Sequence, residues 1–447
     1  MFRVVFRFRH RNLSLYATRW HDLQINVARL RIYCKLRFVT ELHLIKCQER
    51  SELQEGSVLQ EGSELMPQTY DVLIIGRGPV GYVTAIGFAQ AGLNVALIGP
   101  AEAIKRDGRT VAILDGSVEL LTKLGCWEAI RPFAAPLSYM RIIDDTGSLF
   151  RSPPVTFKAS ELKLDAFGYN VELADLTACL AGIASDTQNI TRFDTRVSAY
   201  ALNDIGNSSV QLATGEKLYA PVLIGADGRK SSVRLSAQIN LKEWSYPQTA
   251  LTAIFKHQRD HHDISTEFHT RQGPFTLVPL PDRRSSLVWM MEPSRAERLM
   301  ALSDRSLTQE VEKQAQSILG AMSIEGERGL VPMAGMTVET YANHHVALVG
   351  EAAHVFPPIG AQGLNLGFRD VASLLEAFKA HRGSEALARY NKARQADVKL
   401  RTAAVDLMNK SLLANYLPID FARSMGLLAV ASIPPLRRFM MQRGAGH

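Results

Sequence analysis

Three glycines near residue 76 have the spacing of a loop that binds a pyrophosphate. Gly76, Gly78 and Gly81 follow an apolar run at residues 71–75, and a helical pattern and a second apolar run at residues 95–98 come after them. The first glycine permits a tight turn, the second lets the main chain approach phosphate, and the third lets helix and strand pack closely. Free N–H groups at the helix start would favour the phosphates. We therefore predict a dinucleotide site, although this motif alone does not separate NAD from FAD.

One part of that pattern is missing. A carboxylate that binds the ribose is expected at the end of the second strand, about 20 residues after the glycines. Gly99 and Pro100 stand there instead, and Glu102 and Asp107 follow only beyond the strand. The ribose contact is therefore absent, supplied by one of these two acids, or replaced by another group. Arg109 is a candidate to reach the phosphates, with a surface ion pair as the alternative.

Two later segments narrow the choice of cofactor. In the first of them, a strand over residues 220–226 runs into the pattern Asp227-Gly-x-x-Ser231-x-x-Arg234. A carboxylate at such a strand end can accept hydrogen bonds from sugar hydroxyls or fix a neighbouring loop. Taken alone, an ordinary Asp-Gly turn would be the better explanation.

The second segment is more specific. A buried strand ends in Gly350-Glu351, Pro358 follows, and Gly363 and Leu364 begin a helix with an apolar face. Small residues let a flat ring system approach the main chain, and the N–H groups at the helix start would face an anionic pyrimidine ring. Since this arrangement stabilises a reduced flavin, we expect FAD rather than NAD.

The order of the three motifs resembles that of the FAD-dependent aromatic hydroxylases, and most closely the ubiquinone-biosynthesis hydroxylases of the UbiH/UbiF type. Residues 362–370 and the later pattern Tyr390-x-x-x-Arg394-x-x-Asp397 are similar to that subgroup in particular. The resemblance extends from about Tyr70 to the C-terminus.

This resemblance implies FAD as the cofactor and assigns its contacts. Asp227 would support both FAD and NAD(P)H binding, and Glu351 would hold the ribityl chain. Two positions depart from the family, which often has an acid where Gly99 stands and usually has Asp where Glu351 stands. No catalytic base stands out. The expected cofactor-binding residues are Gly76, Gly78, Gly81, Arg109, Asp227, Gly350, Glu351, Pro358, Gly363, Leu364 and Asn365, with Pro358, Gly363, Leu364 and Asn365 at the flavin ring.

The implied fold is α/β. It comprises a Rossmann-like FAD-binding domain with a three-layer parallel sheet, an inserted, mostly antiparallel β-sheet domain that binds substrate, and a C-terminal helical region. Residues 1–65 read as a basic, low-complexity extension outside the fold. We assign residues 66–145, 165–235 and 336–400 to the FAD-binding domain, residues 146–164 and 236–335 to the substrate-binding domain, and residues 401–447 to the helical region.

The inserted domain is where substrate contacts are expected. Its short apolar runs, joined by polar turns such as residues 281–284, predict an antiparallel sheet. Family members use such a sheet to cover the flavin and bind substrate. Phe275, Leu277, Trp289 and Met290 could line an apolar slot, although ordinary sheet core is the better explanation for any single one of them.

The activity implied by the resemblance is a monooxygenase of ubiquinone biosynthesis. NAD(P)H or another donor would reduce FAD, and O2 would form a flavin C4a-hydroperoxide that hydroxylates the aromatic ring of a polyprenylated phenol. Two alternatives stay open. The protein could be a flavin hydroxylase of a small soluble aromatic, or a flavin-binding scaffold of a biosynthetic complex, which the departures at Gly99 and Glu351 would motivate.

The distribution of charge bears on partners and location. The formal net charge is +7, but residues 1–50 carry +8 and residues 51–65 carry −4, which leaves the remainder at +3. We therefore expect no nucleic-acid partner. Residues 1–50 could be a mitochondrial transit peptide or a basic membrane-surface segment, and we favour an extension that takes no part in folding. The expected location is the cytoplasm, or the mitochondrial matrix if residues 1–50 are a transit peptide.

The C-terminus suggests a contact surface. Residues 403–442 are rich in apolar side chains and end near Arg437, Arg438 and Arg443. They could pack on their own domain, on a second copy in a homo-oligomer, or peripherally on an inner membrane that holds a polyprenylated substrate or its biosynthetic complex.

We expect no metal site. The four cysteines form no C-x-x-C pair. His261 and His262 are adjacent, and neighbouring side chains on an extended chain point to opposite sides.

Overall fold

The computed structural model describes most of the chain after residue 67. Described are residues 68–101, 104, 106–147, 152–202, 208–343, 345–356 and 362–413, with side chains as far as Val398 except that of Gln362, together with residues 437, 438 and 441 and the strands β1 (Val4–Phe8) and β2 (Arg11–Leu15). The chain separates into two units, residues 1–66 and 67–447. In the first unit, β1 and β2 pair in antiparallel register.

A parallel sheet of five strands lies at the centre of the second unit. Its order is β11-β5-β4-β15-β21, and every neighbouring pair runs parallel. All residues of the four strands from β5 to β21 are buried, which explains why the sequence shows uninterrupted apolar runs rather than alternation. The strands are β4 (Val72–Ile75), β5 (Val95–Ile98), β11 (Ile190–Phe193), β15 (Val222–Gly225) and β21 (Val346–Leu348).

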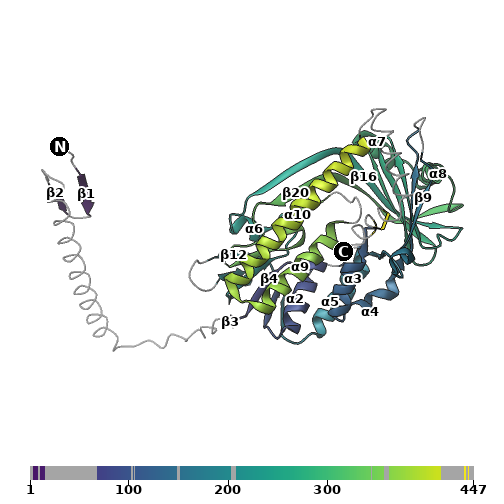
Figure 1. The fold of residues 1–447 in the computed structure, drawn as a ribbon. Helices are drawn as coiled ribbons and strands as arrows, with labels where there is room; N and C mark the ends of the chain where they lie inside the picture. Colours follow the sequence, from purple (N-terminus) through teal and green to yellow (C-terminus); the bar gives the residue numbers. More distant parts are fainter. Residues whose placement is uncertain are drawn as a thin grey trace. The chain divides into compact units, whose positions relative to one another are not determined.

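Helices and a small second sheet complete this domain. Helix α2 (Pro79–Gln90) contacts β4 and β5 and lies between α5 (Leu173–Asp186) and α9 (Gln362–Ala380), as Figure 1 shows. A four-stranded sheet, in the order β12-β13-β14-β3, contacts β4 through β14. Its strands are β3 (Gln68–Thr69), β12 (Val197–Ala201), β13 (Ser208–Leu212) and β14 (Lys217–Ala220), and α10 (Gly383–Leu413) packs against α9.

An eight-stranded sheet forms the other large element. Its order is β22-β20-β16-β19-β18-β17-β8-β9, and its neighbouring pairs are antiparallel except β17 with β8. Helices α7 (Pro293–Met300) and α8 (Asp304–Gln314) pack on one of its faces. The strands are β8 (Tyr139–Asp144), β9 (Val155–Lys158), β16 (Leu241–His257), β17 (Ile264–Thr270), β18 (Gly273–Leu280), β19 (Arg284–Met291), β20 (Met322–Val338) and β22 (His354–Val355).

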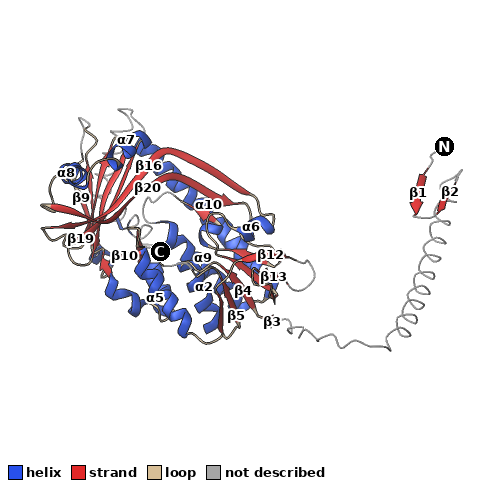
Figure 2. Cartoon of the chain, turned by 180° about the vertical axis from the view of Figure 1, so that it is seen from behind, coloured by secondary structure: helices blue, strands red, loops and turns tan. Residues whose placement is uncertain are grey.

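A three-stranded antiparallel sheet has the order β6-β10-β7, and its strands β10 and β7 contact β18 of the eight-stranded sheet. Figure 2 shows β10 between the label of β19 and helix α5. The predicted fold class is confirmed. The domain limits differ in detail. The strands β8 and β22 and the end of β20 belong to the eight-stranded sheet, although the sequence assigned residues 66–145 and 336–400 to the FAD-binding domain. The remaining elements are β6 (Thr110–Leu114), β7 (Ala134–Pro136), β10 (Gly168–Glu172), α3 (Asp115–Lys123), α4 (Trp127–Ile130), α6 (Ser232–Ser236), η1 (Arg131–Phe133), η2 (Ala159–Leu162) and η3 (Gly350–Ala352).

Candidate active site

The glycine loop connects β4 to α2, as predicted. Gly76 has a φ of +116°, and its N–H donates to the Ile98 carbonyl at 2.8 Å. A Cβ at Gly76 would overlap the Ala226 carbonyl, and a Cβ at Gly81 would overlap the Gly76 carbonyl. At Gly78, which caps α2, no atom lies within 4 Å of such a Cβ. Packing therefore requires glycine at positions 76 and 81. Gly78, by contrast, faces open space, which fits a phosphate group.

The helices of the first and third motifs approach each other closely. A Cβ at Gly367 of α9 would lie 2.8 Å from Val80 Cγ2 and 3.2 Å from the Gly350 Cα. Further along, a Cβ at Gly87 of α2 would lie 2.5 Å from Leu375 Cδ1. Glycines on both helices thus bring the two cofactor motifs together.

The second motif is a local hydrogen-bonded unit. Asp227 accepts hydrogen bonds from the Ser231 hydroxyl at 2.5 Å and from the Ser232 N–H at 2.7 Å. It also accepts one from the Val233 N–H at 3.2 Å. The carboxylate thus holds the start of α6, which matches the loop-fixing role that the sequence left open for it.

The third motif rests on a buried carboxylate that sequence reasoning missed. Asp370 of α9 is fully buried and accepts hydrogen bonds from the Gly350 N–H at 2.8 Å and from His354 Nε2 at 2.6 Å. Its other oxygen accepts from Arg394 Nε at 2.7 Å. Burial lowers the pKa of Arg394, but the negative groups around it, Asp370 first among them and Asp397 as well, together raise it by more, so that the pKa lies above its usual value. The similarity of residues 362–370 and of Arg394 to the hydroxylase subgroup was the available signal.

The predicted flavin-ring residues lie at the start of α9. Gly363 and Leu364 are half-buried, while Pro358 lies outside the described residues. Asn365 is 5% exposed, and its side chain accepts from the Leu114 N–H at 2.9 Å and donates to the Ala112 carbonyl at 2.7 Å. Its amide therefore fastens α9 to β6, so we assign it a positioning role.

Glu351 follows Gly350 at the end of β21, in η3, and its side chain is exposed. Gly350 has a φ of +61°, and a Cβ there would lie 3.1 Å from Val80 Cγ2. The glycine therefore permits the close turn that presents Glu351. An exposed carboxylate at this strand end fits the predicted contact with a sugar-alcohol chain.

Arg109 lies directly before β6 and is 59% exposed. Its Nε is 2.8 Å from Asp107, and this hydrogen bond is the main cause that lowers the pKa of the Asp107 carboxyl. The surface ion pair that the sequence allowed is therefore present, and Asp107 is engaged by it. Glu102, the other candidate for the ribose contact, lies outside the described residues.

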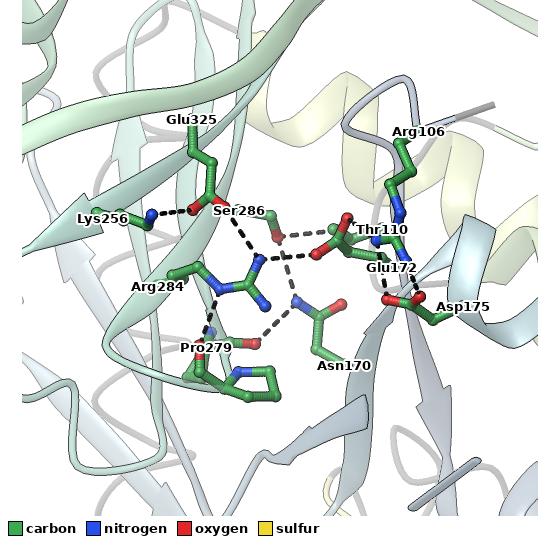
Figure 3. A network of polar contacts seen from close by, with 11 residues as sticks. Arg106, Thr110, Asn170, Glu172, Asp175, Lys256, Pro279, Arg284, Ser286 and Glu325 are labelled. Atoms are coloured by element: carbon green, nitrogen blue, oxygen red, sulfur yellow. Dashed lines mark hydrogen bonds and ion pairs between the residues drawn. The ribbon is translucent and has the colours of Figure 1, made fainter. Parts of the chain in front are cut away.

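A polar network joins the eight-stranded sheet to β6 and β10 (Figure 3). The Ser286 hydroxyl lies 2.9 Å from that of Thr110 and accepts from Asn170 Nδ2 at 3.2 Å. Arg284 Nη1 lies 2.8 Å from Glu172, which is 8% exposed. Further ion pairs come from Arg106, Asp175, Lys256 and Glu325. The network fixes the sheet over the FAD-binding domain.

Ser286 shows which face of the sheet is turned toward that domain. Ser286, Val288 and Met290 alternate along β19 and therefore share one face. Since Ser286 contacts Thr110 and Asn170, this face lies toward β6 and β10. An apolar cluster lies on it, made of Tyr246, Ala250, Val288, Met290 and Met333.

The predicted substrate residues lie on the opposite face, except for Met290. Phe275, Leu277 and Trp289 are at most 2% exposed and belong to the core beneath α7 and α8. Their placement agrees with the ordinary-core interpretation that the sequence left open. Neighbouring residues of a strand, such as Trp289 and Met290, point to opposite faces of the sheet, but the sequence does not show which face lies toward the cofactor. For this reason the sequence alone names both residues as candidate substrate contacts.

Two other expectations concern metals and the C-terminus. In the described part of the chain, no group of three or more His, Cys, Asp or Glu side chains could hold a metal ion. His261 Nε2 lies 3.0 Å from the Leu280 carbonyl, and His262 is exposed.

Near the C-terminus, Arg437 Nε is 2.7 Å from Glu161, and the guanidinium lies 4.7 Å from the ring centroid of Phe157.

Comparison with known proteins gives the site its context. The family described as FAD binding domain matches residues 69–404. The ubiquinone hydroxylase UbiL of Rhodospirillum rubrum is 31% identical over 388 residues, which cover 84% of this chain and 89% of that protein. The 3-demethoxyubiquinol 3-hydroxylase of Escherichia coli is 31% identical over 394 residues, which cover 85% of this chain and 99% of that protein.

Solved structures share the fold. The p-nitrophenol 4-monooxygenase PnpA from Pseudomonas putida superposes with a TM-score of 0.70 at 16% identity, covering 85% of this chain and 98% of that chain. PqsL, a probable FAD-dependent monooxygenase from Pseudomonas aeruginosa, has a TM-score of 0.68 at 23% identity and covers 81% of this chain and all of that one.

Proposed function

Since the chain belongs to the FAD binding domain family and is an FAD-dependent aromatic hydroxylase, we propose that it hydroxylates the ring of a polyprenylated phenol in ubiquinone biosynthesis. The observation that carries the proposal is the 31% identity to two ubiquinone-pathway hydroxylases over more than four fifths of the chain. The arrangement of the three cofactor motifs around α2 and α9 supports it.

Different residues of the site would bind different parts of the cofactor. The glycine loop at Gly78 and the start of α2 would receive the pyrophosphate, and Glu351 would accept hydrogen bonds from the ribityl hydroxyls. The N–H groups at Gly363 and Leu364 would face the ring. Bound FAD supplies the oxygenation chemistry, for which we propose NAD(P)H as electron donor and O2 as co-substrate.

The apolar cluster is our candidate for the substrate contact. Val288 and Met290 lie on the face of the sheet that meets β6 and β10, and Met333 lies with them. Apolar side chains there would exclude water from the reacting ring and bind an apolar substrate. Phe275 and Trp289 would then act indirectly, by supporting the sheet from behind.

A polyprenylated substrate would reside in a bilayer. None of the described helices is long and apolar enough to cross a membrane. Because such a substrate would have to be taken up from the bilayer, we propose peripheral contact with the inner membrane, or with a ubiquinone-biosynthesis complex on it. Since Arg437 is paired with Glu161, the basic contribution of the C-terminus to such a contact would come from Arg438 and Arg443. A mitochondrial location would follow if residues 1–50 act as a transit peptide.

The test uses full-length protein with FAD bound, in detergent micelles under isotopically labelled O2. One sample receives a polyprenylated phenol and another a short water-soluble phenol, each with NADH or NADPH. We expect labelled hydroxyl only in the polyprenylated product, together with nicotinamide oxidation. Labelled product from the soluble phenol alone would establish the small-aromatic alternative instead. A yellow protein that forms neither product, even after chemical reduction of its flavin, would favour the scaffold.

A further inference from the structure

Arg77, between the first two glycines of the loop, fills the space at the end of β5. Its Nη1 donates to the Gly99 carbonyl at 3.2 Å. A Cβ added at Gly99 would lie 2.9 Å from Arg77 Cγ and 3.1 Å from its Cδ. An acidic side chain at position 99 would therefore have to displace the arginine stem. The side chain of Arg77 in this position therefore requires glycine at position 99.

Asp194 follows directly after the neighbouring strand, β11, whose end lies beside Gly99. Phe193, the last residue of β11, pairs with Ile98, the last residue of β5, and the Gly99 N–H donates to the Phe193 carbonyl at 3.1 Å. Adjacent strands are about 4.8 Å apart, so Asp194 lies about one strand spacing from where the usual ribose-binding acid would stand. Its side chain forms an ion pair with Arg77 and is still 56% exposed.

Arg77 is largely buried beside this carboxylate. Its side chain is 13% exposed, and its Nε is buried without a hydrogen-bond partner among the residues that the structure describes. The glycine loop to which Arg77 belongs is where the pyrophosphate and its adjoining ribose are expected.

We propose that Asp194 supplies the missing ribose carboxylate and that Arg77 positions it. Asp194 accepts a hydrogen bond from a hydroxyl of the adenosine ribose of FAD, and Arg77 holds the carboxylate in place through their ion pair. The ribose-binding acid thus stands at the end of β11 rather than at its usual position at the end of β5. The side chain of Arg77 fills the space that the usual acid would occupy. The inference concerns cofactor recognition and is independent of which phenol is hydroxylated.

The test compares FAD with FMN, which lacks the adenosine half. The full-length chain, freed of flavin, is titrated with each by fluorescence quenching. We expect Asp194→Asn and Arg77→Leu each to raise the Kd for FAD about tenfold, because each removes a hydrogen bond that involves a charged group. The Kd for FMN should stay within about twofold of its starting value. Asp186→Asn and Arg192→Leu, which change exposed side chains on α5 and β11, serve as matched controls and should bind FAD normally.

A rescue experiment separates recognition from a structural role. Gly99→Glu alone should weaken FAD binding, because the new side chain meets the Arg77 stem. Gly99→Glu combined with Arg77→Ala restores the usual strand-end acid and should bring the Kd for FAD back to within about threefold of the starting value. The proposal is overturned if Asp194→Asn binds FAD normally, if FAD and FMN affinities fall together, or if the double variant is no better than Gly99→Glu.

Discussion

Arg234 donates a hydrogen bond from Nη1 to the Ala352 carbonyl at 2.8 Å, across 118 residues of chain. Its Nη2 donates to the Arg229 carbonyl at 2.8 Å, and the residue is 4% exposed. Because Ala352 follows Glu351, this contact holds the main chain that carries Glu351, the residue we propose as the ribityl contact. The second motif therefore acts in part by positioning the third.

Replacing Arg234 should weaken FAD binding without touching a direct FAD contact. Arg234→Met keeps the apolar stem but leaves two carbonyls without their donor, so we expect a ten- to hundredfold rise, roughly, in the Kd for FAD. Fluorescence titration measures it. Arg229→Ala is the control, because Arg229 contributes only its main-chain oxygen. Equal affinity in Arg234→Met and the control would contradict the coupling.

Asp370 should be essential for stability as well as for the cofactor site. Asp370→Asn would leave the buried Arg394 without its anion, and breaking such a pair costs about 3–5 kcal/mol of unfolding free energy. Asp397→Asn removes the more exposed partner of Arg394 and should cost about 1 kcal/mol or less. Urea unfolding measures both. Adding Arg394→Gln to Asp370→Asn should recover part of the loss, and a loss no greater than that of Asp397→Asn would refute the role of the buried pair.

The cofactor loop could be predicted from sequence because its constraints are local. Gly76, Gly78 and Gly81 lie within six residues, between a strand and a helix that have clear apolar patterns. The hairpin of β18 and β19 is similar, since its polar turn over residues 281–284 places Asp282 and Arg283 at positive φ. In both cases short spacing along the chain determines the geometry.

Contacts between distant segments could not be predicted in the same way. Asp194 lies 117 residues after Arg77, and only the parallel register of β11 with β5 brings the two together. Likewise, alternation along β19 shows that Trp289 and Met290 face opposite ways, but only the contact of Ser286 with Thr110 shows which face meets the FAD-binding domain. The choice between core and substrate contact depended on that contact.

Alanine at two of the loop glycines should have separable effects. At Gly81 the added Cβ overlaps the Gly76 carbonyl, so Gly81→Ala should lower the unfolding free energy of the flavin-free protein by about 1–3 kcal/mol. Gly78→Ala meets nothing within 4 Å and should leave that stability unchanged while weakening FAD binding. Thermal unfolding with and without FAD distinguishes them. Unchanged FAD binding in Gly78→Ala would show that the open space does not receive the pyrophosphate.

Docking of the C-terminal residue Arg437 should depend on pH. Hydrogen bonds from Arg437 at 2.7 Å hold the pKa of the Glu161 carboxyl below its usual value. The stabilisation is therefore fully present above the ordinary glutamate pKa of about 4.3, and it is lost as pH falls through the lower pKa of the folded state. Hydrogen exchange of peptides containing Arg437, corrected for intrinsic rates, should show protection at about pH 7 that persists at the ordinary glutamate pKa and is lost only as pH falls further.

Glu161→Gln should release the same peptides already at pH 7, because it removes the charge that pairs with Arg437. Glu128→Gln, at an exposed ion pair with Arg131, is the control and should keep them protected. Protection at pH 7 in Glu161→Gln equal to that of the control would mean that other contacts dock this segment.

The neighbours Trp289 and Met290 test which face of the sheet binds substrate. Both are 1% exposed, so alanine at either position should lower stability, by about 3–5 kcal/mol for Trp289→Ala and about 2–5 kcal/mol for Met290→Ala. Only Met290 belongs to the apolar cluster turned toward β6 and β10. We therefore expect Met290→Ala to raise KM for a polyprenylated phenol about three- to tenfold with kcat nearly unchanged, whereas Trp289→Ala leaves KM unchanged in the folded fraction. Steady-state hydroxylation at a temperature where both variants are folded measures this. A side chain that contacts the substrate changes KM without changing the chemical step. A rise in KM for Trp289→Ala alone would therefore show that substrate binds on the face of the sheet beneath α7 and α8.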